Sequence, residues 1–357
     1  MPIDIYKTKN IQAAIEQTTP VTSFLRDRYF PTDEDSLFVE EEVIVEFKDS
    51  TGHKMAPVVL PRKGSISIER EGYSTHRMEP PLVAPSRFLS IDDAKKRQMG
   101  ESIFSTQTPA QRQAKILMQD VRELDGMITT REEYIAAKCM FNNGYVLKQY
   151  ADKYGEGEYK EYELRFYGAT GNSAVYAPNT MWDAADDAAI FADLHQMLRM
   201  LTTKGNNASE VLLGSDVAEV LMKNEKLQKL MDLARYNVGE IAPIELPHNA
   251  ARLGRLNVRG RVIDLLTYDG TYVDEETGNV ESFVPANKIC VTAPGAGRSL
   301  YGAVSQMEQI SGQLETYPGR RVPRYWADKN GRELTVSSHP LLVPKTKDCF
   351  ITAEVLG

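Results

Sequence analysis

The side chains best suited to chemistry are few and lie far apart in this 357-residue chain. It has five histidines and three cysteines: His53, His76, His195, His248, His339, Cys139, Cys290 and Cys349. No two of them have the spacing of a zinc site or of a metalloprotease helix, and there is no GxSxG nucleophile elbow. An odd number of distant cysteines favours reduced thiols over a disulfide framework. We therefore predict no catalytic residue, no cofactor and no metal.

Two stretches resemble binding sites only superficially. Pro294–Ser299 is glycine-rich and follows a predicted strand, but Gly302 breaks the dinucleotide spacing and no Gly-Lys-Ser/Thr follows, so a plain loop is expected. The acidic run Glu156, Glu158, Glu161 and Glu163 could coordinate a cation, yet it suits the solvated face of a strand better. Catalytic groups can still assemble from distant residues, so an enzyme is not excluded.

Composition narrows the class of protein. Hydrophobic residues make up 42% and charged residues 26%, which is enough for a packed core. The net charge of −8 disfavours tight nucleic-acid binding, because such domains usually carry a basic face. No apolar run is long enough to span a bilayer, and the N-terminus lacks a signal-peptide pattern.

The elements that must position any site are organised around one long helix, predicted over 108–142. Thr108, Pro109 and Gln111 form a helix start with a capping box. Apolar residues recur at intervals of three and four from Ala114 to Ile135 and predict one buried stripe. A second capping pattern at Thr130–Glu133 leaves a break near Thr129 open. Three methionines are expected to fill the core: Met118, Met127 and Met140.

An N-terminal arm is predicted over 1–42. A short helix is expected near 10–17, and a second, capped by Thr19-Pro20, ends at Phe30-Pro31. Such a short aromatic helix cannot bury its apolar face alone. It must dock either on the core of its own chain or on a neighbouring subunit.

Two hairpins are indicated. In the first, over 43–85, alternation predicts strands at 43–48 and near 65–69, and Pro80–Pro85 forms an extended connector. The second runs from 145 to 167 with its turn at 153–158.

An α/β block follows over 183–300. It has helices at 184–202 and from a Ser215 cap to about Ala234, and strands at 210–213, 261–268 and 288–292. A final half-buried strand at 349–355 is expected to return to the layer of the long helix.

The order of these parts resembles the major capsid proteins of tailed phages, in particular the lambda-like major capsid protein E family. The resemblance covers nearly the whole chain and depends on the order of several short motifs. They are Thr19-Pro20, Ser23-Phe24-Leu25, Tyr29-Phe30-Pro31, Ala56-Pro57-Val58, Arg62-Lys63-Gly64, Arg70-Glu71-Gly72-Tyr73, Pro80-Pro81, Arg298-Ser299-Leu300-Tyr301-Gly302-Ala303, Tyr325-Trp326, Ser338-His339-Pro340-Leu341-Leu342-Val343-Pro344 and Phe350-Ile351.

The resemblance implies an α+β, Johnson-type capsid fold in five parts. These are an N-terminal arm (1–42), an extended β-hairpin loop (43–85), a peripheral domain with the spine helix and a hairpin (86–179), an axial domain (180–315) and a C-terminal return to the peripheral domain (316–357). Contacts between subunits are expected from the arm and the loop. The candidate contact residues are Phe24, Leu25, Tyr29, Phe30, Arg62 and Lys63.

The function so implied is a major capsid protein that self-assembles, as pentamers and hexamers, into the icosahedral head shell of a tailed phage. The shell would enclose double-stranded DNA without sequence-specific binding. The expected partners are a separate scaffolding protein, a portal and a decoration protein, with assembly in the host cytoplasm and no membrane. Two alternatives stay open: an encapsulin-like compartment, and a cytoplasmic α/β enzyme with its site in 180–315.

Overall fold

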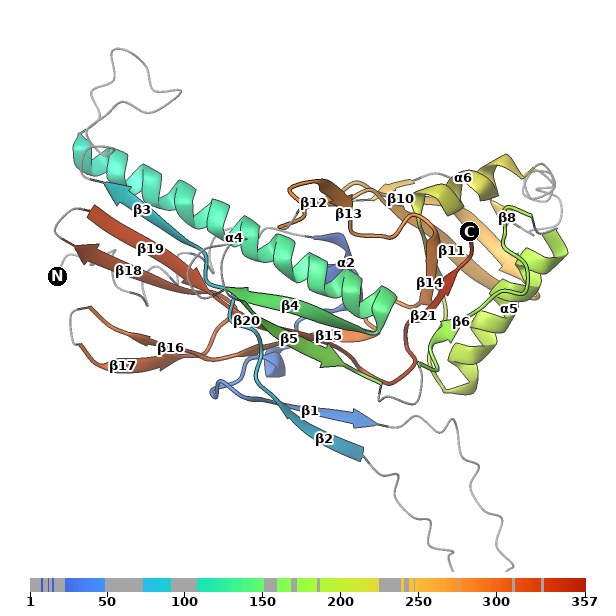
Figure 1. Ribbon diagram of the computed structural model, residues 1–357, viewed down its shortest axis with the longest axis horizontal. Helices are drawn as coiled ribbons and strands as arrows, with labels where there is room; N and C mark the ends of the chain where they lie inside the picture. Colours follow the sequence, from blue (N-terminus) through green and yellow to red (C-terminus); the bar gives the residue numbers. More distant parts are fainter. Residues whose placement is uncertain are drawn as a thin grey trace, which may run out of the picture.

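The structure is a computed structural model, and it shows an elongated molecule along which one long helix runs (Figure 1). The residues that it describes are 8, 12, 15, 23–48, 73–90, 108–150, 159–167, 172–184, 187–224, 239–240, 244–246, 248–275, 277–309, 312–328 and 331–357.

The long helix is α4 (Pro109–Asn142), and its bounds confirm the prediction. The Thr108 hydroxyl accepts a hydrogen bond from the Gln111 N–H, and the Gln111 side chain accepts one from the Thr108 N–H, which completes the capping box. The helix continues through Thr129, so the break that was left open does not occur. It ends at Asn143, in the left-handed region (φ 53°). Gly144 follows because a Cβ there would lie 2.5 Å from the Leu164 carbonyl oxygen.

The apolar stripe of α4 packs against two clusters. Its N-terminal half meets strand β19 (Gly331–Ser337). Its C-terminal half enters the largest core together with the arm helix and strands β15 (Gly297–Gly302) and β20 (His339–Pro344). In the N-terminal half only one face of the helix is covered, whereas every residue over 131–141 is buried or half-buried. Met140 is buried as predicted, but the prediction for Met118 and Met127 is wrong, since they lie off the stripe and are 41% and 56% exposed.

Small sheets lie along the same part of the molecule as α4 (Figure 1). The strand order β18-β19-β3 forms a three-stranded sheet, and four antiparallel pairs are β1–β2, β4–β5, β15–β20 and β16–β17. The strands are β1 (Val43–Lys48), β2 (Tyr73–Met78), β3 (Ser86–Ser90), β4 (Gly144–Tyr150), β5 (Tyr159–Arg165), β15 (Gly297–Gly302), β16 (Val304–Met307), β17 (Leu314–Tyr317), β18 (Val322–Asp328), β19 (Gly331–Ser337) and β20 (His339–Pro344). Both predicted hairpins thus exist. The return strand of the first is 73–78, and its expected strand at 65–69 lies outside the described residues.

An eight-stranded mixed sheet forms the other end of the molecule (Figure 1), in the order β6-β21-β14-β7-β11-β10-β8, with β9 also paired to β10. Helices α5 (Asp187–Thr203) and α6 (Ser215–Lys223) pack in one apolar cluster with it. The strands are β6 (Val175–Tyr176), β7 (Glu210–Leu213), β8 (Gly239–Glu240), β9 (Ile244–Leu246), β10 (Ala250–Val258), β11 (Arg261–Tyr268), β14 (Lys288–Thr292) and β21 (Ile351–Glu354). A separate hairpin pairs β12 (Thr271–Val273) with β13 (Val280–Ser282).

The last strand corrects a prediction. β21 lies between β14 and β6 in the eight-stranded sheet instead of returning to the layer of α4. Over 351–353 it is buried on both faces rather than one, because Ile351 and Ala353 enter the cluster of α5 and Thr352, on the opposite face, is only 3% exposed.

Two helix starts also differ from the prediction. The helix after β7 is capped by Gly214 and not Ser215, and it ends at Lys223. Glycine is required there because a Cβ would lie 2.3 Å from the carbonyl oxygens of Pro285 and Ala286. The arm helix, α2, spans Phe24–Tyr29 instead of starting at Pro20, since Ser23 is extended and its N–H donates to Asp27. A 3₁₀ turn, η1 (Glu34–Ser36), follows it.

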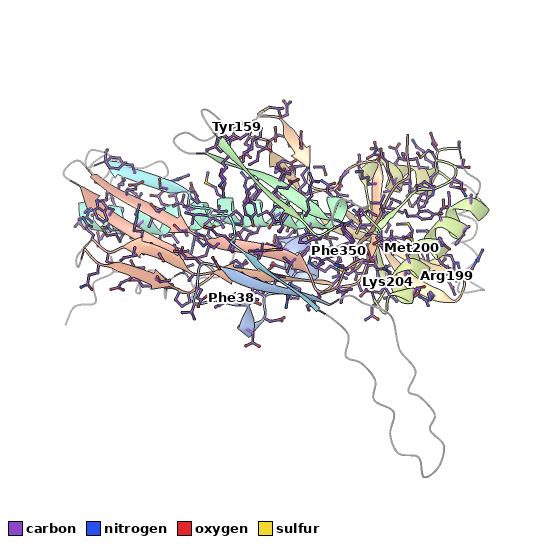
Figure 2. All side chains as sticks on the ribbon, turned by 60° about the horizontal axis from the view of Figure 1, so that its bottom comes forward. Phe38, Tyr159, Arg199, Met200, Lys204 and Phe350 are labelled. Atoms are coloured by element: carbon purple, nitrogen blue, oxygen red, sulfur yellow. The ribbon has the colours of Figure 1, made fainter. Side chains whose placement is uncertain are left out.

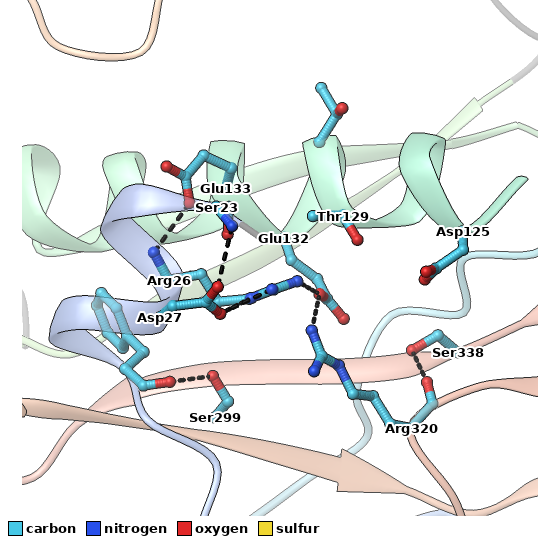
Figure 3. Close-up of polar contacts among 12 residues, drawn as sticks. Ser23, Arg26, Asp27, Asp125, Thr129, Glu132, Glu133, Ser299, Arg320 and Ser338 are labelled. Atoms are coloured by element: carbon cyan, nitrogen blue, oxygen red, sulfur yellow. Dashed lines mark hydrogen bonds and ion pairs between the residues drawn. The ribbon is translucent and has the colours of Figure 1, made fainter. Parts of the chain in front are cut away.

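A buried ion cluster joins three distant segments (Figure 3). The carboxylate of Glu132, on α4, is fully buried and accepts two hydrogen bonds from Arg321, at 2.7 and 3.0 Å, and one from Arg26 at 2.7 Å. Arg320 approaches to 3.5 Å. Burial alone would raise the pKa of Glu132, but the charges and hydrogen bonds of Arg321, and then the charges of Arg26 and Arg320, lower it to about 2.

Two more carboxylates hold the arm helix. Glu133 accepts hydrogen bonds from the N–H groups of Leu25 (2.8 Å) and Arg26 (2.9 Å) at the helix start. Glu210, on β7, accepts one from the Arg28 Nε (2.9 Å) and one from the Tyr29 hydroxyl (2.9 Å). The arm helix is therefore fixed between the long helix and the eight-stranded sheet.

Glu132→Gln should destabilise the subunit by about 3–5 kcal/mol, because it removes the fully buried charge that Arg26 and Arg321 share and leaves each only one, less buried carboxylate, Asp27 or Asp125. Urea unfolding of the unassembled subunit measures this. Glu123→Gln on the same helix is the matched control, since Glu123 is 42% exposed, and it should cost less than about 1 kcal/mol. Equal midpoints for the two variants would contradict the assigned role of Glu132.

Acid should weaken the subunit through the same group. The folded-state pKa of Glu132 lies below its usual value of 4.5, so its contribution is complete above pH 4.5 and is lost as the pH falls toward 2. Unfolding midpoints taken between pH 5 and 2 should therefore fall more steeply for the wild type than for Glu132→Gln. Parallel profiles would show that another group governs the acid response.

Candidate assembly surfaces

The structure places the four predicted contact residues of the arm inside the chain's own core. Phe24, Leu25, Tyr29 and Phe30 are at most 5% exposed, and Phe30 stacks on Phe350 with ring centroids 5.3 Å apart. Of the two alternatives for the arm helix, docking on its own chain is the one observed. As contacts between subunits these side chains stay a prediction, as do Arg62 and Lys63, which lie outside the described residues.

The candidate chemical residues do not assemble into a site. Cys139, Cys290 and Cys349 are free and buried, and burial raises the pKa of each thiol. All three belong to the same buried cluster, where α4 meets the large sheet. His195 and His248 lie at or near the surface, His339 is buried, and His53 lies outside the described residues. Of the loop predicted over 294–299, only Pro294–Ala296 is a loop; for Gly297–Ser299 the prediction is wrong, because these residues pair with β20 as the start of β15.

A polar cluster around Asp348 borders a cavity of about 290 Å³ next to α5. Tyr167 (2.7 Å), Ser173 (2.6 Å) and Lys204 (2.8 Å) all hydrogen-bond to the Asp348 carboxylate. Burial would raise its pKa, but these hydrogen bonds, with Lys204 first, lower it. These hydrogen bonds connect the turn before β21 to the end of α5 and to the segment before β6.

Within the ranges that the structure covers, no group of three His, Cys, Asp or Glu side chains is arranged to hold a metal ion.

A larger groove of about 590 Å³ lies between the end of α4 and the β4–β5 hairpin. Its polar lining includes Lys138, Glu163 and Arg165, and Arg165 is paired with Glu163. None of the helices in the described part of the chain has the length and apolarity to cross a bilayer.

Two hairpins expose matched apolar pairs that the sequence did not reveal. Met307 and Leu314 lie opposite each other on β16 and β17 and are 51% and 71% exposed. Val273 and Val280 lie opposite each other on β12 and β13 and are 65% and 69% exposed. The two side chains of such a pair contact each other, and their exposed apolar area is available to a neighbouring surface. Only the register reveals them, because the paired residues are seven positions apart in each hairpin.

The base of the β1–β2 hairpin exposes a second apolar group. Leu37, Val39, Ile44 and Leu82 are each at least 44% exposed. Their segments converge, because the Phe38 N–H donates to the Tyr301 carbonyl, the Ala303 N–H to the Glu40 carbonyl and the Val83 N–H to the Ser338 carbonyl. The described surface thus offers apolar side chains at the loop base and on two projecting hairpins.

The amino-acid sequence is similar to those of known capsid proteins. The family model described as phage major capsid protein E matches residues 7–355. The major capsid protein of Enterobacteria phage P21 is 20% identical over 358 residues, covering 98% of this chain and 99% of that protein. The major capsid protein of Escherichia phage lambda is 22% identical over 313 residues, covering 84% and 85%.

The fold agrees with these matches. The crystal structure of the putative capsid protein of a prophage from Escherichia coli CFT073 superposes with a TM-score of 0.64 at 18% identity, covering 98% of each chain. This likeness confirms the predicted fold class, a mixed helix-and-sheet capsid fold. Because the family model spans almost every residue, the chain belongs to the phage major capsid protein E family.

Proposed function

We propose that this chain self-assembles into the icosahedral head shell of a tailed bacteriophage and encloses its double-stranded DNA. The observation that carries the proposal is the match of the capsid family model over residues 7–355. The exposed apolar pairs on β12–β13 and β16–β17 support it, because an elongated subunit with such pairs gains stability from neighbours. The encapsulin-like alternative is less supported, since the family and the relatives are named as phage proteins.

The parts of the subunit have separate roles in this proposal. The block around the eight-stranded sheet is axial and surrounds five-fold and six-fold positions, and the α4 layer is peripheral. Residues 43–85 reach over a neighbour. A scaffolding protein, a portal and a decoration protein are the expected partners, and assembly occurs in the host cytoplasm. The subunit has a structural and not a catalytic role, in keeping with the Asp348 cluster, whose polar groups are occupied by one another.

Electron microscopy of the overexpressed full chain tests the proposal directly. Closed shells, or tubes where a scaffold is missing, are expected, together with fast-sedimenting species. A stable monomer or small oligomer at high concentration would favour the enzyme alternative.

Met307→Ser with Leu314→Ser should reduce the yield of shells at least tenfold while leaving the subunit folded. Both side chains are already exposed in the single chain, so the change removes apolar area only from the contact with a neighbour. Particle counts and sedimentation give the yield, and circular dichroism checks the fold. The matched control, Met307→Leu with Leu314→Met, keeps the pair apolar and should assemble normally. If the serine variant also assembles normally, β16–β17 is not a contact.

A further inference from the structure

Basic side chains gather where the outer face of α5 meets the β10–β11 turn. Arg199 lies one helical turn after His195, near the end of α5, where Figure 2 shows it beside Met200 and Lys204. Nη1 of Arg259 is 3.4 Å from Nδ1 of His195. Arg261 directly follows the turn that carries Arg259. Desolvation, and then the charges of Arg259, Arg199 and Arg261, lower the pKa of His195, in keeping with these positions. We call Arg199, Arg259 and Arg261 the arginine cluster.

The turn that presents two of these arginines has a defined geometry. Val258 pairs with Arg261, which leaves Arg259 and Gly260 as the two loop residues. Both have positive φ, at 49° and 90°, as a two-residue hairpin turn of type I′ requires. The Gly260 N–H donates to the Asn257 side chain at 2.8 Å. A hydrogen-bonded turn therefore holds Arg259 and Arg261 next to α5.

The arginine cluster has no acidic partner among the residues that the structure describes. Each of its side chains belongs to an exposed residue. The arginines of the adjoining strand β10 differ, since Nε of Arg255 lies 2.8 Å, and Nη1 of Arg252 4.0 Å, from Oδ1 of Asp264. Three uncompensated positive charges thus lie close together on a chain whose net charge is −8.

The chemistry of the cluster favours a phosphate-bearing polymer. Guanidinium groups bind phosphate oxygens in a bidentate geometry and are weakly hydrated. Protein interfaces usually bury an apolar anchor at their centre, whereas the arginines here lie near a histidine and a polar turn, with Val262 beside them. Double-stranded DNA carries one charge per about 1.7 Å of its axis, so one segment can meet all three arginines.

We propose that the arginine cluster binds the phosphate backbone of double-stranded DNA without regard to sequence. The inference rests on the proposed function, in which the shell encloses DNA. It also refines the expectation from net charge: the chain as a whole is acidic, but one face of the axial block attracts DNA.

The test is fluorescence anisotropy of a labelled 30-base-pair duplex with the full-length, unassembled subunit at several salt concentrations. Arg199→Gln, Arg259→Gln and Arg261→Gln together should weaken binding at least tenfold at low salt. The slope of log affinity against log salt should fall by about 3, since each phosphate contact contributes about 0.9. Each single variant should lower the slope by about 1.

The matched control changes three exposed, ion-paired arginines outside the cluster: Arg87→Gln, Arg165→Gln and Arg255→Gln. It alters net charge equally and should change the affinity less than threefold. Equal losses in the two triple variants would overturn the proposal, because net charge alone would then explain the binding. So would a cluster variant that binds DNA like the wild type.

A protein partner is the competing occupant, and a separate readout identifies it. The cluster variant should form shells at the wild-type yield, so loss of DNA binding with normal shells supports the proposal independently of assembly. Loss of shells in both the cluster variant and Val262→Ser, with DNA binding intact, would assign this face to a contact between subunits instead.

Discussion

The fold depends on one buried carboxylate, that of Glu132. A charge in the interior is tolerated only with compensating charges and hydrogen bonds, and here they come from Arg26 in the arm and from Arg321 near the C-terminal strands. The arm, the long helix and the β18–β20 region must all be in place before the carboxylate is satisfied. This polar joint lies where the two apolar clusters along α4 meet, so it fixes how the two halves of the helix surface are covered.

Glu133 and Glu210 are the carboxylates that stabilise the arm helix. A helix of six residues has too few internal hydrogen bonds to be stable alone, so its free N–H groups and arginines need external acceptors. Glu133 supplies one from α4, and Glu210 supplies another from the eight-stranded sheet. Because the arm helix uses its apolar residues to connect these two layers, the exposed apolar surface of the subunit lies elsewhere, on hairpins and at the loop base.

The sequence predicted the elements whose signals are local. The capping box at Thr108 and a stripe at helical spacing defined α4 within one residue, and alternation defined the β4–β5 hairpin. Prediction from the sequence failed where contacts with residues far away in the chain determine the structure. β21 reads as half-buried because its flanking strands, β14 and β6, come from remote segments. Gly214 displaces Ser215 as the cap because a loop 70 residues later packs against it. The arginine cluster needs α5 and the β10–β11 turn to be neighbours, which periodicity cannot show.

The distribution of charge and apolar surface follows from what the subunit must do alone and what it does in a shell. Charges that hold the single chain together are paired and buried, as at Glu132, where removal of a partner leaves a cost that folding cannot avoid. The apolar hairpin pairs and the arginine cluster, in contrast, are exposed in the single chain. Both features are exposed to water in the free subunit. They can therefore contribute binding free energy only when a neighbouring subunit or a polyanion contacts them. A subunit built this way folds before it assembles, and its interior joint is independent of the contacts that close the shell.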